Sequence, residues 1–207
     1  DFTMEADGNA RWILVNTFIA KRSITVHKVW SNNAVARQAV TIDLYRNDDL
    51  TKPYQSLPLP ITTDSVTFDN LPEYASNGAA YTYTLKESVA TGYLPGVFTG
   101  PVISADQKTY AYTLTNTPSR LIVSKLAANT TSELPGAKLR LVKGDGTDIS
   151  DANSVEIWQS GTDGQNANGS YKPHTILGKL DIGAQYTLVE IEAPAGYLAA
   201  APITFTY

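Results

Sequence analysis

The sequence predicts an all-β protein made of two similar β-sandwich domains in tandem, and three observations support that prediction. Short runs rich in Val, Ile, Thr, Tyr and Phe alternate with breakers that contain Gly, Pro, Asn and Asp, at the spacing typical of a sandwich or barrel. No stretch carries a long apolar periodicity of 3.6 residues. The order of motifs in the first half recurs in the second. The predicted strands are 11–17, 23–30, 39–46, 65–69, 80–88, 109–116, 120–126, 137–143, 154–158, 184–191 and 202–207.

Stretches rich in proline and glycine are expected to separate these strands. The segments 57–60 (LPLP), 71–72 (LP) and 161–164 (GTDG) are interpreted as breaks, because proline lacks a backbone donor and glycine favours turns. The polar tract 163–170 is expected to be an exposed loop.

The composition favours a protein with packed hydrophobic cores and without anionic partners. Its 207 residues suffice for one large or two modest domains, and a hydrophobic content of 43% supports packed interiors. A net charge of −4 with 17% charged residues lacks the excess of positive charge that is typical of nucleic-acid-binding proteins. No apolar run is long enough to span a bilayer, so we expect no membrane partner. The chain begins at Asp1 without a signal peptide and is interpreted as a mature or excised fragment.

The cysteine and histidine content bears on the possible chemistry. There is no cysteine, which excludes disulfides, a cysteine nucleophile and a thiolate metal site. The two histidines, His27 and His174, stand far apart in sequence. We therefore expect no metal site and no cofactor.

The strand predicted at 23–30 carries a lysine on its apolar face. Alternation places Ile24, Val26, Lys28 and Trp30 on one side of that strand. A lysine almost never faces a core without a partner, because an isolated buried ammonium is strongly disfavoured. The pattern therefore predicts that Lys28 meets another polar group.

Two later strands offer such groups on their own inward faces. Glu87 replaces a hydrophobe in the stripe of strand 80–88, which would continue to Val89, and Asn116 ends the stripe of strand 109–116. The three polar residues together predict one buried constellation. The alternative for each residue alone is structural: Lys28 extends its ammonium to water, and Asn116 is a turn residue before Thr-Pro.

The motifs of the first half recur in the same order in the second half. Residues 24–28 (ITVHK) are echoed by 121–125 (LIVSK), and residues 83–87 (YTLKE) by 186–190 (YTLVE), each glutamate being followed by a Gly-Tyr pair. Lys125 and Glu190 thus correspond to Lys28 and Glu87. The repeat predicts two domains of immunoglobulin-like size, 20–118 and 119–207, with a linker short enough to make a stiff rod.

At these motifs the sequence resembles the Cna B-type domains of Gram-positive surface proteins and pilins, including their SpaA-like variants. The lysine strand, the YTLxE strand with its Gly-Tyr and the closing TNT strand carry the resemblance in the first unit. Residues 134–137 (LPGA) and 186–197 (YTLVEIEAPAGY) carry it in the second. The resemblance covers residues 20–207 and implies tandem Ig-like sandwiches of the transthyretin or prealbumin type.

The resemblance also implies a chemistry for the constellation. It implies that Lys28 and Asn116 are joined by an intramolecular isopeptide bond, with Glu87 as the catalytic acid, and it places Lys125 and Glu190 in the same roles in the second unit. Such a bond forms once per domain, so we do not expect an enzyme that turns over substrates.

The N-terminal segment complements the second unit. Residues 12–18 (WILVNTF) repeat the closing strand 112–118 (YTLTNTP), so residues 1–19 are interpreted as the closing strand of a preceding or partner domain, with Asn16 as the acceptor. The second unit reaches Tyr207 without an asparagine strand. One hypothesis is that strand 11–18 of one molecule is donated head-to-tail to another, beside Lys125 and Glu190. The alternative is that the chain was cut from a longer tandem array.

Three classes of function stay open on the sequence alone. The resemblance favours a stalk or shaft segment of a pilus or adhesin, extracellular and attached to the cell wall, with neighbouring pilin or surface-protein domains as partners. An adhesive module that binds host matrix protein or glycan through loops 47–64 or 144–170 is the alternative. An accessory sandwich of a secreted hydrolase is the third, and no catalytic constellation of the chain supports it.

Overall fold

A computed structural model describes residues 2–4, 10–12 and 20–207 of the chain. Within these ranges the structure is nearly all β, as predicted, and its only helix is one 3-10 turn, η1 (Asp151–Asn153). No helix of the described part is therefore long enough to cross a membrane. The strands are β1 (Phe2–Met4), β2 (Ala10–Trp12), β3 (Lys21–Trp30), β4 (Val40–Arg46), β5 (Gln55–Leu59), β6 (Ser65–Pro72), β7 (Tyr83–Glu87), β8 (Val97–Ile103), β9 (Thr109–Asn116), β10 (Arg120–Val123), β11 (Lys138–Lys143), β12 (Ser154–Gln159), β13 (His174–Leu177), β14 (Gln185–Glu192) and β15 (Ile203–Thr206).

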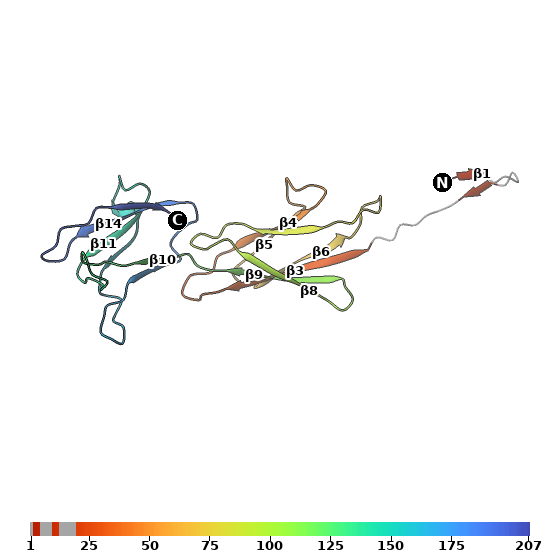
Figure 1. The fold of residues 1–207 in the computed structure, drawn as a ribbon. Coiled ribbons are helices and arrows are strands. Elements are labelled where there is room, and N and C mark those ends of the chain that lie inside the picture. Colours follow the sequence, from red (N-terminus) through yellow and green to blue (C-terminus); the bar gives the residue numbers. More distant parts are fainter. Residues whose placement is uncertain (1, 5–9, 13–19) are drawn as a thin grey trace.

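The first domain is a sandwich of two sheets (Figure 1). One sheet has the order β6-β3-β9-β8 and the other has the order β5-β4-β7. In the first sheet, β3 pairs antiparallel with β6 and parallel with β9, so the first and last strands of the domain are neighbours. Alternate apolar side chains of both sheets fill the space between them, because successive side chains of a strand point to opposite faces. The most deeply buried are Val26, Ile42, Leu44, Phe68, Leu71 and Leu114.

The second domain repeats this arrangement up to its last strands. Its sheets have the orders β10-β13 and β12-β11-β14-β15, so β10 to β14 take the places of β3 to β7. The two domains differ after that point. In the first domain β8 pairs with β9, whereas β15 pairs with β14. No described strand takes the place of β9 beside β10.

Most predicted strands are present, and several of the errors involve proline in an edge strand. The segments 57–60 and 71–72 were predicted as breaks, but Pro58 lies within β5 and Pro72 ends β6. Both strands lie at sheet edges, where a missing backbone donor leaves no hydrogen bond unmade. β1, β5, β8 and β13 were not predicted. Gly100 and Pro101 interrupt β8 where its register with β9 shifts, which hides the alternation. The predicted strand 11–17 begins within β2, and residues 13–17 lie outside the described part.

The two domains lie end to end and meet at a tight joint (Figure 1). Ser119 is fully buried there, and both its backbone N–H and its Oγ donate to the carbonyl of Gly92, at 2.9 and 3.0 Å. In return, Leu180 N donates to Ser119 Oγ and Gly178 N donates to the Ser119 carbonyl. Gly92 N also donates to Asp181 Oδ1 at 3.0 Å. The Gly-Tyr turn of the first domain is thus docked on the second domain.

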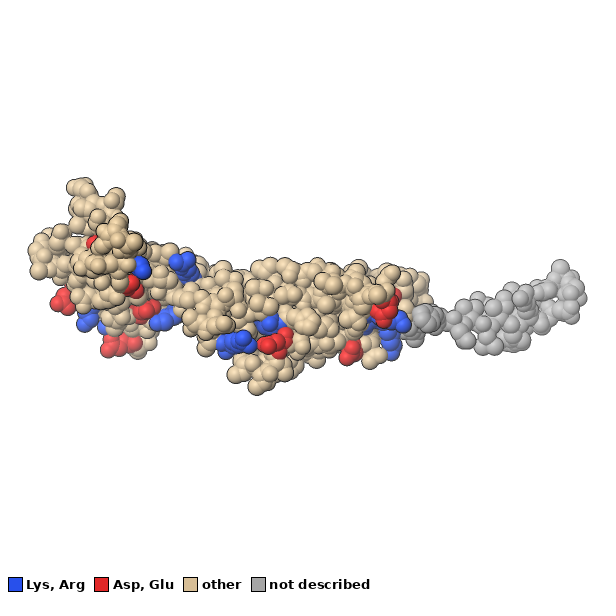
Figure 2. Space-filling model, turned by 90° about the horizontal axis from the view of Figure 1, so that it is seen from below, with Lys and Arg blue, Asp and Glu red and all other residues tan. Residues whose placement is uncertain are grey.

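The surface of the described part carries charges of both signs. Figure 2 shows an elongated body on which lysine and arginine side chains are interspersed with acidic ones. On the face shown, no patch of a single sign extends over a whole domain.

Candidate functional site

Three strands bring Lys28, Glu87 and Asn116 together inside the first domain. In the parallel register of β3 and β9, Lys28 lies opposite Leu114 and Asn116 lies opposite Trp30. Leu114 and Asn116 are two residues apart, so Lys28 and Asn116 project from the same face of the sheet. Glu87 is the last residue of β7 in the facing sheet. The group thus spans the space between the two sheets.

The three side chains form a closed set of polar contacts. Lys28 Nζ donates to Asn116 Oδ1 at 2.5 Å, and Asn116 Nδ2 donates to Glu87 Oε2 at 3.0 Å. Lys28 Nζ also lies 3.6 Å from Glu87 Oε1. The side chains of Lys28 and Glu87 are 2% and 4% exposed, and Asn116 is fully buried. The sequence-predicted residues are therefore in mutual contact and out of water.

Burial and charge act in opposite directions on the lysine. Desolvation lowers the pKa of Lys28, and the Glu87 carboxylate only partly offsets that effect. The Trp30 ring lies 3.8 Å from Nζ and favours the charged amine. Glu87 Oε1 accepts no hydrogen bond within the described part of the chain. The arrangement is a costly way to stabilise a core, which points to a chemical role.

Gly96 belongs to the site and was missed by the sequence analysis. A Cβ on this residue would overlap Glu87 Oε2 and would lie 2.6 Å from Leu114 Cδ1 and 2.9 Å from Asn116 Oδ1. Only hydrogen leaves room for the glutamate and asparagine to meet. The sequence signal is weak, since Pro95-Gly96 reads as an ordinary turn.

Val89 and Tyr93 follow Glu87 in the chain, and only Tyr93 packs near the site. Val89 was predicted to face inward but is 91% exposed, because β7 ends at Glu87 and the alternation ends with it. Tyr93 of the Gly-Tyr turn is 2% exposed and meets the Trp30 ring edge-on, with ring centroids 4.7 Å apart. This aromatic pair closes the junction end of the site beside Lys28.

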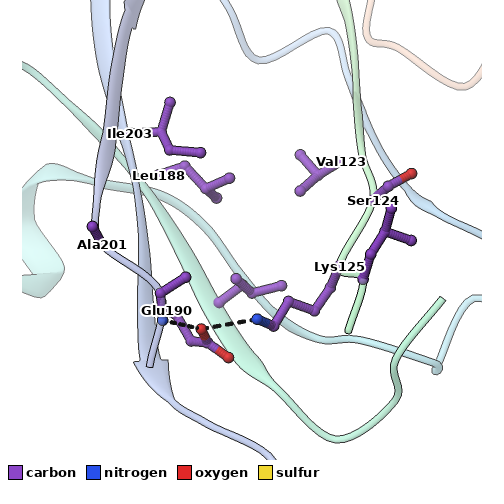
Figure 3. A pocket seen from close by; sticks show the side chains of 10 residues that line it. Val123, Ser124, Lys125, Leu188, Glu190, Ala201 and Ile203 are labelled. Atoms are coloured by element: carbon purple, nitrogen blue, oxygen red, sulfur yellow. Dashed lines mark hydrogen bonds and ion pairs between the residues drawn. The ribbon is translucent and has the colours of Figure 1, made fainter. Parts of the chain in front are cut away.

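The second domain holds a corresponding pair without a third member. Lys125 Nζ lies 3.1 Å from Glu190 Oε2, and the two side chains are 15% and 1% exposed. Figure 3 shows them pointing toward one another across a pocket. Glu190 Oε2 also accepts from Ala200 N, whereas Oε1 has no hydrogen-bond partner among the described residues. Asn16, the predicted acceptor, lies outside the described residues.

The pocket beside this pair has a volume of about 210 Å³. Apolar side chains of β10, β11, β14 and β15 line it together with the two charged groups. In the first domain, β9 supplies a third side chain, Asn116, which contacts both the lysine and the glutamate. The lining residues are Val123, Ser124, Lys125, Leu126, Leu139, Leu188, Glu190, Ala200, Ala201 and Ile203.

The two histidines lie in different domains. His27 is exposed on β3. His174 stacks on Trp158 with ring centroids 4.5 Å apart, and its Nδ1 lies 3.0 Å from Asp163 while its Nε2 lies 3.4 Å from Glu156. No group of three or more acidic or histidine side chains in the described part is arranged to hold a metal ion.

Comparisons with known proteins divide the chain at the joint. The family model of the Cna protein B-type domain matches residues 24–117, and the SpaA prealbumin-like fold domain matches residues 119–207. A search of curated protein sequences found no significant match.

Among solved structures, the shaft pilin SpaA of Lactobacillus rhamnosus GG is 18% identical, with 90% of this chain and 93% of that chain covered and a TM-score of 0.36. The Bacillus anthracis TIE protein is 19% identical over 89% of this chain and 31% of that chain, with a TM-score of 0.37. The pilus adhesin SpaC of Lactobacillus rhamnosus GG is 18% identical over 91% of this chain and 22% of that chain, with a TM-score of 0.48.

Proposed function

Since residues 24–117 belong to the Cna protein B-type domain family and residues 119–207 to the SpaA prealbumin-like domain family, we propose that the chain is a structural stalk or shaft segment. It would belong to a pilus or surface adhesin on the cell wall of a Gram-positive bacterium, with neighbouring pilin or surface-protein domains as its partners. An isopeptide bond between Lys28 and Asn116 would brace the first domain. The closed, buried contact of Lys28, Glu87 and Asn116 is the observation that carries this proposal.

The proposed reaction is an attack by the lysine amine on the asparagine carboxamide. The Lys28 Nζ–Asn116 Cγ bond forms, the Cγ–Nδ2 bond breaks, and one amine proton leaves with Nδ2 as ammonia. Burial lowers the pKa of Lys28 and so favours the neutral amine that the attack requires. The products are one amide and one ammonia, and no further reactant is needed.

The position of Glu87 supports a role in proton transfer. Its Oε2 lies 3.0 Å from Asn116 Nδ2, the nitrogen that must leave, and its Oε1 lies 3.6 Å from the lysine. A carboxyl group between these atoms can take a proton from the attacking amine and deliver it to the leaving nitrogen. The contact to Nδ2 supports this role, whereas polarisation of Oδ1 by Glu87 would require the carboxamide to turn over.

The folded core supplies much of the remaining rate enhancement. Lys28 Nζ is held against the Asn116 carboxamide by the parallel pairing of β3 and β9, so the two groups react at a high effective concentration. The product stays in the chain. The reaction is therefore a single self-modification in each molecule.

The position of the bond suits a load-bearing segment. β3 is the first strand of the domain, and β9 leads through the joint into the second domain. Tension along the chain would enter through β3 and leave through β9. A covalent bond between them would carry that load in place of sheet hydrogen bonds.

Intact mass spectrometry tests the bond. The wild-type chain is expected to be lighter than its sequence mass by one ammonia for the Lys28–Asn116 bond, whereas Glu87→Gln should show no deficit and have the full mass of its own sequence. Glu192→Gln, which alters an exposed glutamate, is the matched control and should keep the wild-type mass. A wild-type chain at its full sequence mass would contradict the proposal.

Single-molecule extension tests the mechanical role. Lys28 and Asn116 are 88 residues apart in sequence, so the bond would hide about 300 Å of extended chain, at roughly 3.5 Å per residue. Pulling on handles attached before β3 and after Ser119 should release that length from Glu87→Gln but not from the wild type. Equal extension of both proteins would reject the load-bearing role.

A further inference from the structure

A short segment of the first domain connects the joint between the domains to the cross-linking site. This segment, residues 92–96 (GYLPG), begins at Gly92, whose N–H donates to Asp181 and whose carbonyl accepts from Ser119. The segment ends at Gly96, where an added Cβ would overlap Glu87 Oε2. Its position therefore affects the geometry of both the joint and the site.

The middle of the segment contacts the strands that carry the two groups to be joined. The Tyr93 ring meets Trp30 edge-on, with ring centroids 4.7 Å apart, and the Trp30 ring lies 3.8 Å from Lys28 Nζ. Leu94 N donates at 2.8 Å to the carbonyl of Thr117, directly after the end of β9. A shift of the segment would therefore be felt at both the amine and the carboxamide.

One loop of the second domain, residues 178–184 between β13 and β14, holds the start of this segment. Asp181 Oδ1 accepts from Gly92 N at 3.0 Å, and Asp181 Oδ2 accepts from Lys143 Nζ at 3.0 Å. The hydrogen bond from Lys143 holds the pKa of Asp181 below its ordinary value, so the acceptor of the Gly92 N–H is a carboxylate at neutral pH. A charged acceptor makes the stronger hydrogen bond.

The same loop approaches the first domain beside this hydrogen bond. A Cβ on Gly178 would lie 2.6 Å from the Val35 side chain, which packs against the core of the first domain. Ile182 lines a pocket of about 420 Å³ together with Glu87, Tyr93 and other residues of the first domain. The loop therefore forms part of the surroundings of the catalytic glutamate proposed above.

The segment depends on such contacts because it belongs to a connection and not to a strand. Residues 88–96 join β7 to β8, and their only pairing of the sheet type is an isolated bridge between Tyr93 and Pro118. Connecting segments are usually more mobile than the strands that they join. A displacement of about 1 Å in reacting groups can cost on the order of 100-fold in rate. Contacts that fix this connection should therefore affect the rate of the reaction.

We propose that the docked second domain promotes cross-linking of the first domain, and that Asp181 is the positioning residue through which it acts. This inference rests on the proposed function, because it concerns the rate at which the Lys28–Asn116 bond forms. Asp181 holds Gly92, and the segment 92–96 carries that constraint to the site. The reacting groups all lie within the first domain, so the bond would still form without this contact, but more slowly.

This coupling sets an order of events. The first domain would fold, the second domain would fold and dock on the Gly92 turn, and the bond between β3 and β9 would then form at its full rate. The brace would thus be completed in a pair of domains that is already aligned, which suits a segment that carries tension along its length.

The kinetics of bond formation in the full chain test this proposal. Chains made and purified in denaturant are refolded at neutral pH, and the loss of ammonia is followed by intact mass. Asp181→Ala should slow that loss by about tenfold or more, since it frees the Gly92 N–H. Asp181→Asn retains an oxygen acceptor for Gly92 N and should recover most of the wild-type rate. The control Asp151→Ala, which removes an ion pair with Arg140 elsewhere in the second domain, should react as the wild type does.

A second measurement separates positioning from folding. In a Glu87→Gln background, where no bond is expected, pulsed hydrogen exchange gives the folding rate of the first domain with and without Asp181→Ala. The two folding rates should agree. If folding slows by the same factor as the loss of ammonia, Asp181 has only a structural role and the proposal is overturned.

The remaining outcomes distinguish this inference from the proposed function. An Asp181→Ala chain that cross-links at the wild-type rate would overturn the inference, and so would an Asp181→Asn chain that is as slow as Asp181→Ala. In both cases the final mass deficit would still support the Lys28–Asn116 bond. A wild-type chain that loses no ammonia would instead refute the proposed function itself.

Discussion

At the scale of single residues, the site of the first domain is defined by how its polar groups satisfy one another. Lys28 and Asn116 each make a hydrogen bond inside the core, and Glu87 receives one from the asparagine while lying near the ammonium. Removal of one partner would leave another polar group buried without compensation, which is more destabilising than the loss of the contact itself. The three residues should therefore be treated as one unit in mutagenesis.

Gly96→Ala is predicted to disrupt this unit without changing any of its members. The added methyl group would overlap Glu87 Oε2 and press on Leu114 and Asn116, so we expect a loss of about 1–3 kcal/mol of stability and little or no cross-linking. Denaturant unfolding and intact mass measure the two effects. Gly164→Ala is the control for cross-linking alone, because its Cβ would meet nothing within 4 Å and the mass deficit should persist. Its φ of +85° strains the substituted backbone, so its stability is not compared. A fully cross-linked Gly96→Ala chain would contradict the crowded geometry.

The rate of bond formation should depend on pH through the charge of Lys28. Only the neutral amine can attack the carboxamide, so the rate should fall in acid, where Lys28 is protonated. The rate should rise as the pH approaches the pKa of Lys28 and then level off. Because burial lowers the pKa of Lys28, the rate should level off below pH 10.5, the ordinary lysine value.

These rates can be measured on chains that have been kept in denaturant since their synthesis. The chains are refolded at each pH, and the loss of ammonia is followed over time by intact mass spectrometry. A rate that continues to rise beyond pH 10.5 would show that the reacting amine has no lowered pKa, and it would contradict attack by a buried Lys28.

At the scale of elements, the sequence predicted those strands whose alternation is uninterrupted. Lys28, Glu87 and Asn116 could be identified because each is a polar residue in an otherwise apolar stripe, and a strand places alternate residues on one face. β5 and β8 were missed because prolines in edge strands resemble breaks. Gly96 could not be predicted, since its constraint comes from side chains on two other strands.

Cross-linking of β3 to β9 should dominate the stability of the first domain. The bond would close a loop of 88 residues, which removes loop entropy from the unfolded chain and stabilises the fold by roughly 4–5 kcal/mol. Glu87→Gln should therefore lower the melting temperature of that domain by on the order of 20 °C. Calorimetry would measure the shift, with Glu192→Gln as the control. A shift of only a few degrees would mean that no cross-link had been lost.

At the scale of the whole molecule, the joint decides whether the two domains act as one rod. Domains joined in one chain usually move relative to one another unless their interface is large or specifically bonded. Here Ser119 is fully buried and bonded to Gly92 on one side and to Leu180 on the other. Close approach reinforces the joint, because a Cβ on Gly92 would collide with the carbonyl of Gly178. Both the polar contacts and the packing therefore favour a fixed orientation.

Ser119→Ala is predicted to loosen the rod and leave both domains folded. The substitution removes the hydroxyl that donates to the Gly92 carbonyl and accepts from Leu180 N, and the unpaired buried N–H should destabilise the joint by about 1–3 kcal/mol. The alignment tensors of the two domains, from residual dipolar couplings, should agree in the wild type and diverge in the variant. Ser76→Ala, at an exposed turn of the first domain, should behave as the wild type. The mass deficit for the Lys28–Asn116 bond should persist in Ser119→Ala, since its three partners lie within one domain. Divergent tensors in the wild type would show that the joint does not fix the relative orientation of the domains. Tension would then first align the two domains and only afterwards load the cross-link.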